Sequence, residues 1–230
     1  MQSLIVTLDG PAGSGKSTVA RFLAKRLGLE FLDTGAMYRG LTAKALYRGI
    51  DPATEPHAVI ELARNTVMRF DWYDDPPRLF LGNLDVTDRI RDRDVTSRVS
   101  EVAALSGVRH VLVDIQRRIG EEHPRLVTEG RDQGSVVFPS AQVKFYLDAS
   151  PTVRAKRRAK QIQDAGRKAD LQLIRKQIIE RDHKDSTRVE SPLICPEDAQ
   201  RIDTSDMTLD QVVEHLETLV RDKMNMPTDG

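Results

Sequence analysis

A glycine-rich stretch near the start of the chain limits its fold and chemistry more than any other segment. It fits G-x-x-x-x-G-K-[ST], the phosphate-binding P-loop, and consists of Gly10, Pro11, Ala12, Gly13, Ser14, Gly15, Lys16, Ser17 and Thr18. An apolar run at 4–8 precedes it and predicts a buried strand. Apolar residues at helical spacing follow as far as Leu27, and Gly28 stands where a helix commonly ends. A chance glycine-rich turn would not be expected in this strand–loop–helix context, so we expect nucleotide binding.

The motif predicts particular roles for its residues. Glycines let successive backbone N–H groups turn toward phosphate oxygens, and the N-terminus of the following helix adds positive potential. We expect the loop at 10–18 to bind the phosphates of ATP. Lys16 would reach the β- and γ-phosphates, and the hydroxyl of Ser17 would bind Mg²⁺.

The composition is typical of a soluble globular protein. Of the residues, 39% are hydrophobic and 30% are charged. The length of 230 residues is enough for one large α/β domain or two small ones. No run approaches the length of a membrane span, and the start lacks a signal-peptide pattern. The single cysteine, Cys195, excludes an internal disulfide and suits a reducing cytosol, so we expect a cytoplasmic location.

The charges balance at 35 against 35, but they are unevenly distributed. Residues 154–188 hold 12 Lys and Arg against 5 Asp and Glu, whereas residues 189–230 hold 3 against 10. A basic segment in a neutral protein favours a local anionic ligand over a nucleic-acid surface, and this segment lacks the aromatic residues that stack on bases. We expect no nucleic-acid or membrane partner.

Alternating strands and helices predict a parallel sheet with crossover helices. Ligands of such sheets bind beyond the carboxyl ends of the strands, where Thr34 and Arg39 fall. Helix capping alone would explain Asp33 and Thr34. An arginine early in a helix opposes the helix dipole, which favours substrate contact for Arg39. Besides the first strand, the expected strands are 29–32, 125–128, 143–147 and 199–203, and the early helices are 36–48 and 54–65.

The middle of the chain changes in texture. Short β-like runs within 67–87, broken by a Gly-Asn hairpin turn, predict a small antiparallel insert. A helix at 94–104 contains Ser100. The apolar run at 110–114 could be a strand ending in a Mg²⁺-binding aspartate, but apolar residues recur at three- and four-residue steps, which favours a helix carrying Arg109.

The later segments carry further candidates. Arg131 and Asp132 follow a predicted core strand, which favours a ligand contact over a surface turn. A basic helix from Val153, capped by Thr152, is either a solvated helix or a mobile lid whose arginines close on the nucleotide. Arg181, Asp185 and Arg188 share one face if the second helix, 171–184, continues, which would make an anion clamp. The last helix opens with a Thr208–Gln211 capping box, and its predicted core stripe is Leu209, Val212, Val213, Leu216, Leu219 and Val220.

A P-loop combined with several arginines at strand ends points to phosphoryl transfer, which depends on positioning and charge stabilisation and needs no protein nucleophile. The guanine-binding signature of switch GTPases, Asn-Lys-x-Asp, is absent from the sequence. The residues by themselves therefore indicate an ATP-dependent kinase of a small acceptor that is itself phosphorylated.

Four motifs in order resemble those of bacterial cytidylate kinase: DGPAGSGKST at 9–18, LDTGAMYR at 32–39, EGRDQG at 129–134 and RDHKDSTR at 181–188. The resemblance covers nearly the whole chain. It implies transfer of the ATP γ-phosphate to CMP or dCMP with Mg²⁺. It also implies a three-layer α/β/α P-loop fold with a five-stranded parallel sheet, a small antiparallel β insert and a helical lid.

The resemblance also implies roles for particular residues. Arg131, Asp132 and Ser100 would recognise cytosine, Asp185 the ribose, and the arginines the monophosphate. Arg157 would be the lid residue nearest ATP. Thr34 stands where serine is expected, and Ser17 where some members carry glycine; both keep or add a hydroxyl. The implied substrate-binding set is Thr34, Arg39, Ser100, Arg109, Arg131, Asp132, Arg181, Asp185 and Arg188, and the catalytic set is Lys16, Arg131, Asp132, Arg157, Arg181 and Arg188.

One kinase domain is expected, with a core at 1–35, 105–150 and 189–224, a nucleotide-acceptor region at 36–104, a lid region at 151–188 and a flexible tail at 225–230. We expect a monomer. The alternatives are another small-molecule P-loop kinase acting on UMP, AMP or a non-nucleotide acceptor, and a nucleotide-gated regulator that binds RNA.

Overall fold

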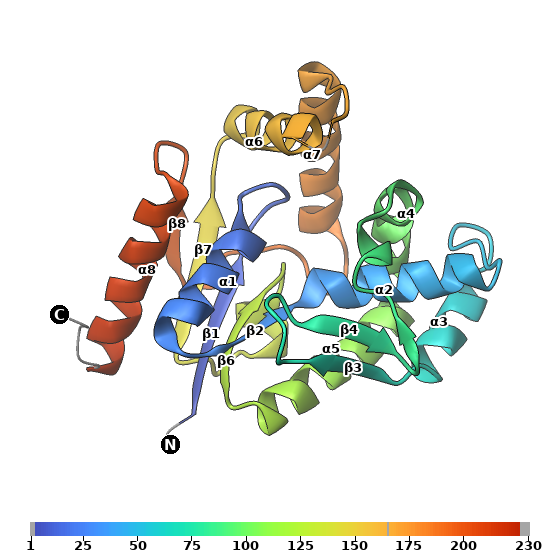
Figure 1. The fold of residues 1–230 in the computed structure, drawn as a ribbon, viewed down its shortest axis with the longest axis horizontal. Coiled ribbons are helices and arrows are strands. Elements are labelled where there is room, and N and C mark those ends of the chain that lie inside the picture. The colour runs from blue at the N-terminus through green and yellow to red at the C-terminus, as the bar shows by residue number, and fades with distance from the viewer. Residues whose placement is uncertain (1–2, 165, 226–230) are drawn as a thin grey trace. The chain divides into compact units, whose positions relative to one another are not determined.

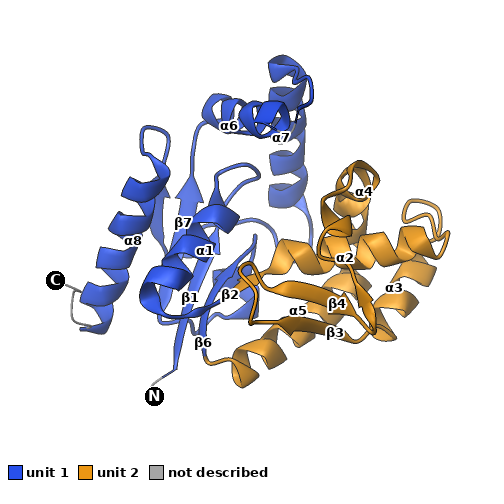
Figure 2. Ribbon diagram, viewed as in Figure 1, with its two compact units in different colours: residues 1–30, 125–230 blue, residues 31–124 orange. Residues whose placement is uncertain are grey.

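A computed structural model of the chain describes residues 3–164 and 166–225 (Figure 1). The chain divides into two compact units, shown in Figure 2: unit 1 comprises residues 1–30 and 125–230, and unit 2 comprises residues 31–124. Most of the predicted tail, residues 226–230, lies outside the described residues. Within the described part of the chain, no helix has the length and apolar character needed to cross a membrane.

A parallel sheet forms the centre of unit 1. Strand β1 (Leu4–Asp9) lies between β6 (Arg125–Glu129) and β7 (Val143–Asp148), and β8 (Gln200–Asp203) pairs with β7. The full order is β2-β6-β1-β7-β8, with β2 (Glu30–Asp33) at the division between the units, which confirms the predicted five-stranded sheet. Because the strands are parallel, their carboxyl ends meet at one edge. Chain positions that are far apart in sequence therefore become neighbours there.

The terminal helices of unit 1 cover this sheet. Helix α1 (Lys16–Leu27) packs against α8 (Leu209–Met224), and α1 ends at Gly28 with a φ of 61°. The capping box of Thr208 and Gln211 is confirmed. The predicted apolar stripe is too wide, because Leu209 is exposed and Leu219 is only half-buried. The residues that anchor α8 are Val212, Val213, Leu216 and Val220.

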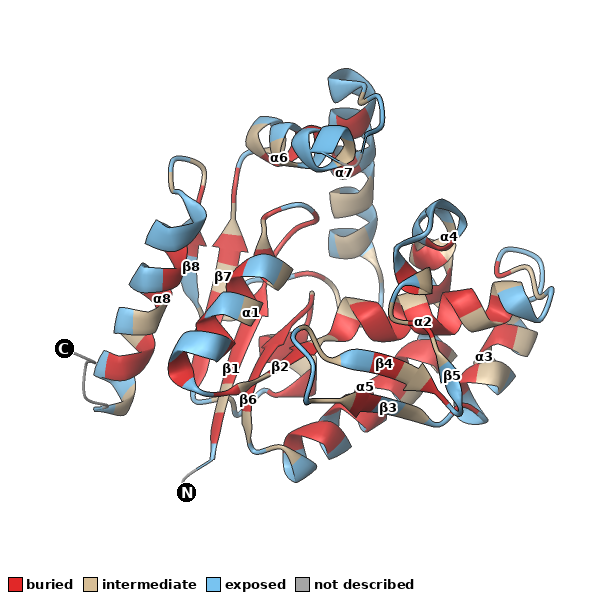
Figure 3. Cartoon of the chain, in the orientation of Figure 1, coloured by how far each residue is buried: buried red, intermediate tan, exposed pale blue. Residues whose placement is uncertain are grey.

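Two further helices of unit 1, the α6–α7 pair, share a small core of their own. Ala155 and Ala159 of α6 (Pro151–Asp164) pack on Ile174 and Ile178 of α7 (Leu171–Thr187). Figure 3 shows that both helices are otherwise mostly exposed, whereas the strands of unit 1 are mostly buried.

The predicted start of α6 is wrong. Thr152 lies inside the helix, and the hydroxyl of Ser150 accepts the N–H of Val153 at 3.3 Å. The helix begins earlier, at Pro151, because the fixed φ and missing N–H of proline suit a first turn.

Unit 2 combines helices with the predicted antiparallel insert. The insert is confirmed as a three-stranded sheet in which Leu81 pairs with Leu84 across a turn at Gly82, whose φ is 64°. The segment around Arg109 is a helix, as predicted, and not a strand. The elements are α2 (Thr34–Tyr47), α3 (Pro56–Arg64), β3 (Met68–Asp71), β4 (Arg78–Leu81), β5 (Leu84–Asp85), a 3₁₀ turn (Arg89–Arg91), α4 (Arg93–Ala104) and α5 (Ser106–Glu122).

Candidate functional site

The glycine-rich loop joins β1 to α1 and can be built only with glycine at its first position. The φ of Gly10 is 145°, and a Cβ there would lie 2.1 Å from the carbonyl oxygen of Leu147. At the other end of the loop, the Nζ of Lys16 donates to the carbonyl of Pro11 at 2.8 Å and to the hydroxyl of Ser14 at 3.4 Å. The loop is thus folded around its own lysine.

The environment of Lys16 is unfavourable for a charge. Its side chain is buried, and this burial lowers the pKa of the ammonium to about 7. The positive charge of Arg131 acts in the same direction, while Glu129 and Asp9 oppose it. The negative charge of a bound phosphate would favour the protonated form of Lys16.

Ser17 has a carboxylate partner that the sequence analysis did not single out. Its hydroxyl donates to Oε1 of Glu129 at 2.6 Å. Glu129 is the last residue of β6 and is buried. The two side chains meet because β6 runs parallel to β1, with Glu129 opposite Leu8. The end of β6 therefore lies at the same edge of the sheet as the loop that leads from β1 to Ser17.

Two arginines of α6 contact the glycine-rich loop. Arg157, the predicted lid residue, donates to the carbonyl of Ser14 at 3.3 Å and to the hydroxyl of Thr204 at 3.0 Å. Arg154, which the sequence analysis did not select, is 3% exposed and donates to the carbonyl of Ala12 at 2.9 Å. Its position in the first turn of a basic helix was the only feature of the sequence that could have indicated this contact.

The predicted clamp is larger than the sequence suggested. Helix α7 continues to Thr187 and ends one residue before Arg188, whose backbone is extended. Arg181, within the helix, and Arg188, directly after it, approach Asp185 at 4.0 and 3.9 Å. The nearest partner of Asp185 is Arg131, whose Nε donates to Oδ2 at 3.0 Å. Burial alone would raise the pKa of Asp185, but Arg131 and Arg181 outweigh this effect and hold the pKa below its ordinary value. One carboxylate thus lies within 4.0 Å of three guanidinium groups and accepts a hydrogen bond from that of Arg131.

Asp132 follows Arg131 and is buried, at 5% exposed. A short π-helical turn (Gln133–Val137) begins directly after Asp132. The carbonyl of Asp132 accepts the N–H groups of Val136 and Val137. No sequence pattern predicted this turn, which directly follows the loop carrying Arg131 and Asp132.

Unit 2 carries the remaining predicted residues. Asp33 caps α2 by accepting the N–H of Ala36 at 2.8 Å, so capping explains Asp33, whereas Thr34 is the buried first residue of the helix. Arg39 pairs with Asp33 at 3.4 Å. Ser100 is half-buried on α4. Arg109 of α5 is buried and lies over the ring of Tyr38, 5.7 Å from its centroid.

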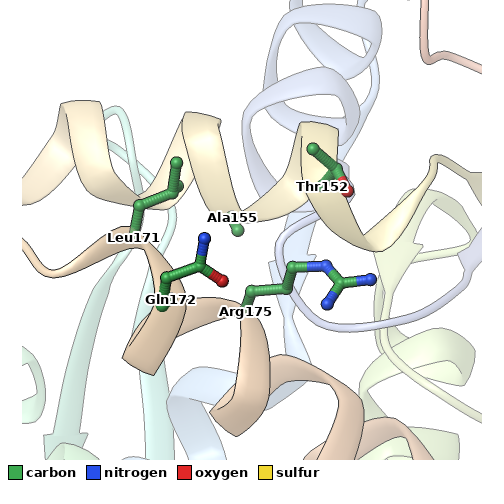
Figure 4. Close-up of a pocket in the computed structure, with 5 residues that line it drawn as sticks. All are labelled: Thr152, Ala155, Leu171, Gln172 and Arg175. Atoms are coloured by element: carbon green, nitrogen blue, oxygen red, sulfur yellow. The ribbon is translucent and has the colours of Figure 1, made fainter.

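A pocket of about 200 Å³ lies within the α6–α7 pair (Figure 4). Its walls come from the start of α6 and the start of α7, whose side chains face one another in the close-up. None of its lining residues is a predicted site residue: they are Thr152, Ala155, Leu171, Gln172 and Arg175.

A model of the family described as Cytidylate kinase matches residues 6–222. The chain belongs to the cytidylate kinase family. A cytidylate kinase of Corynebacterium efficiens is 48% identical over 215 residues, which cover 93% of this chain and 92% of that protein. A cytidylate kinase of Mycobacterium leprae is 45% identical over 223 residues, covering 97% and 98% respectively.

A structural comparison shows the shared fold alone. The crystal structure of an uncharacterized protein from Eubacterium ventriosum aligns with this chain with a TM-score of 0.52 at 11% sequence identity. The alignment covers 96% of this chain and 99% of the other. The cytidylate kinase family model itself spans both units, since residues 6–222 include all of unit 2.

Proposed function

We propose that the protein transfers the γ-phosphoryl group of ATP to CMP or dCMP. The observation that carries the proposal is the presence, in a cytidylate kinase family member, of a buried P-loop lysine, Lys16, around which the loop is folded. The same unit contains Arg131, which pairs with Asp185. Arg131 belongs in turn to a group of arginines around Asp185. In this proposal, unit 1 contributes residues to both donor binding and acceptor binding.

The donor side consists of the loop at 10–18 and Arg157. Backbone N–H groups of the loop bind the ATP phosphates, and Lys16 becomes charged next to them. Arg157 already contacts the loop at Ser14, so it is placed to hold charge that develops during transfer.

We also propose that Ser17 and Glu129 hold Mg²⁺ with the nucleotide. Their hydroxyl and carboxylate oxygens, 2.6 Å apart, are the hard donors that this cation prefers. When bound, Mg²⁺ would neutralise charge on the β- and γ-phosphates. The hydrogen bond between Ser17 and Glu129 keeps the two oxygens next to each other.

The acceptor roles follow from the family resemblance. In unit 1, Arg131 and Asp132 recognise cytosine, Asp185 the ribose, and Arg181 and Arg188 the monophosphate. Unit 2 supplies Thr34, Arg39, Ser100 and Arg109, of which Ser100 recognises cytosine and the two arginines bind phosphate. No protein nucleophile takes part: the residues align the two substrates and stabilise charge in an in-line transfer.

The acceptor is tested by a coupled ADP-release assay across nucleoside monophosphates. CMP and dCMP should be used best, and clearly higher kcat/KM for UMP or AMP would refute the assignment while leaving a kinase. Lys16→Met should abolish transfer. Asp132→Ala should raise the KM for CMP far more than the KM for ATP, and equal increases would refute cytosine recognition by Asp132.

We further propose a monomeric, cytoplasmic enzyme with a core at 1–35, 105–150 and 189–224, an acceptor region at 36–104 and a lid at 151–188. Size-exclusion chromatography with light scattering tests the monomeric state. Limited proteolysis with and without both nucleotides tests the lid, because closure should protect the exposed α6–α7 pair.

A further inference from the structure

A buried carboxylate connects the phosphate-binding loop to the loop that carries Arg131 and Asp132. Asp9 is the last residue of β1, directly before Gly10, and is 1% exposed. The N–H of Gln133 donates to its Oδ1 at 2.8 Å, and the N–H of Gly134 donates to its Oδ2 at 2.7 Å. Both oxygens are therefore used on two consecutive amides, immediately after Asp132.

The same loop is also fixed on its other side. The N–H of Gly130 donates to the carbonyl of Leu8 at 3.0 Å. The side chain of Gln133 accepts the hydroxyl of Thr128 at 2.9 Å. Arg131 and Asp132 thus lie between two attachments to β1. The backbone carbonyl of Leu8 forms the first, and the side chain of Asp9 forms the second.

We propose that Asp9 is a positioning residue for acceptor recognition, which sets the placement of Arg131 and Asp132 without itself touching the nucleotide. This inference rests on the proposed function, because it assumes that Arg131 and Asp132 contact CMP. It extends that function because Asp9 belongs to β1, the strand that leads into the ATP-binding loop, and yet would control affinity for the acceptor.

The chemistry of the contact favours a carboxylate. A neutral asparagine would be easier to bury, but its side chain has one acceptor oxygen and could satisfy only one of the two amides. Burial raises the pKa of Asp9 to about 6, with the two backbone amides opposing this shift, so ionising the side chain here costs free energy. The bidentate contact reduces that cost but does not cancel it.

Gly134 shows independently how closely the loop lies on β1. A Cβ at Gly134 would be 2.9 Å from Oγ1 of Thr7, 3.2 Å from Cδ of Lys144 and 3.4 Å from Oδ2 of Asp9. Oγ1 of Thr7 is buried and has no hydrogen-bond partner within the described part of the chain. An added methyl group would therefore push the loop away from Asp9, and removing the Thr7 hydroxyl would relieve the shortest of these contacts.

The first experiment compares Asp9→Asn with the wild-type protein. KM values are measured for CMP at saturating ATP and for ATP at saturating CMP. The KM for CMP should rise about tenfold, because one buried amide loses its acceptor, while the KM for ATP should change less than about twofold. The matched control is Asp148→Asn, at the end of β7, where the carboxylate accepts the N–H of Ala149 and pairs with Arg201 but contacts neither Gln133 nor Gly134. It should leave the KM for CMP unchanged.

The second experiment uses steric rescue. Gly134→Ala should raise the KM for CMP, Thr7→Ala should leave it unchanged, and the double variant should recover most of the loss. A purely structural role predicts no split between the nucleotides and no rescue. If Asp9→Asn does not fold, the Gly134 and Thr7 variants decide.

The outcomes separate the two hypotheses. A wild-type protein that does not phosphorylate CMP refutes the proposed function. A wild-type protein that does so, with equal KM increases for both nucleotides in folded Asp9→Asn or with no rescue by Thr7→Ala, refutes the positioning role of Asp9 alone.

Discussion

Arg154 and Asp182 together hold both polar backbone atoms of Ala12. Nη1 of Arg154 donates to the Ala12 carbonyl at 2.9 Å, and Oδ1 of Asp182 accepts the Ala12 N–H at 3.3 Å. The two side chains also pair with each other at 2.7 Å. Since Arg154 belongs to α6 and Asp182 to α7, both helices of the α6–α7 pair are connected to the same point of the phosphate-binding loop.

Asp182→Asn should destabilise the protein by about 2 kcal/mol, because Arg154 would remain buried without its ionic partner. It should also raise the KM for ATP more than that for CMP. Urea unfolding and steady-state kinetics measure the two effects. Glu180→Gln, which removes an exposed pair with Lys176 on the same helix, is the control and should change little. If Arg154→Met and Asp182→Asn have strictly additive effects on stability, the two side chains are not coupled.

ATP binding should take up protons at about pH 8. In the unliganded protein most Lys16 is neutral at that pH, because burial lowers its pKa to about 7. Phosphate charge next to the amine raises the pKa again, so the lysine gains a proton on binding. Calorimetry in two buffers of different ionisation enthalpy measures this uptake. The same uptake in Lys16→Met would assign it to another group.

Glu129→Gln should raise the Mg²⁺ concentration needed for half-maximal activity about tenfold or more, because an amide is a weaker ligand than a carboxylate for this cation. Ser17→Ala should act in the same direction, and Ser17→Thr should preserve the hydroxyl and most of the activity. Activity is measured across a Mg²⁺ titration at fixed ATP. An unchanged Mg²⁺ dependence in Glu129→Gln would exclude Glu129 from the metal site.

The contribution of Asp185 to stability should disappear in acid. Its pKa in the folded protein lies below the ordinary value of 3.8, despite burial, because Arg131 and Arg181 favour the charged form. The contribution is therefore fully present above pH 3.8 and is lost as the pH falls through the folded-state pKa. Urea unfolding of wild type and Asp185→Asn should differ most near neutral pH and converge in acid. A difference that stays constant down to strongly acid pH would contradict this linkage.

Local patterns accounted for most elements of the fold and for part of the candidate site. The helix around Arg109, the capping box of Thr208 and the hairpin at Gly82 follow from spacing within a few residues, and the structure confirms all three. The start of α6 and the burial of Leu209 were predicted wrongly. Both lie at helix ends, where the periodic pattern is weakest and neighbouring segments decide burial and capping.

The glycine-rich loop, the alternation of strands and helices, and the family motifs could be predicted because they depend on residues that are close together in the chain. Which carboxylate contacts which group depends instead on how the chain folds. Ser17 meets Glu129 across 112 positions, Gln133 meets Asp9 across 124, and Arg131 meets Asp185 across 54. The first two pairs form because the strand order differs from the chain order: β6 lies beside β1, and their parallel register brings distant strand ends to one edge of the sheet. The third pair forms because helix α7 brings Asp185 to Arg131.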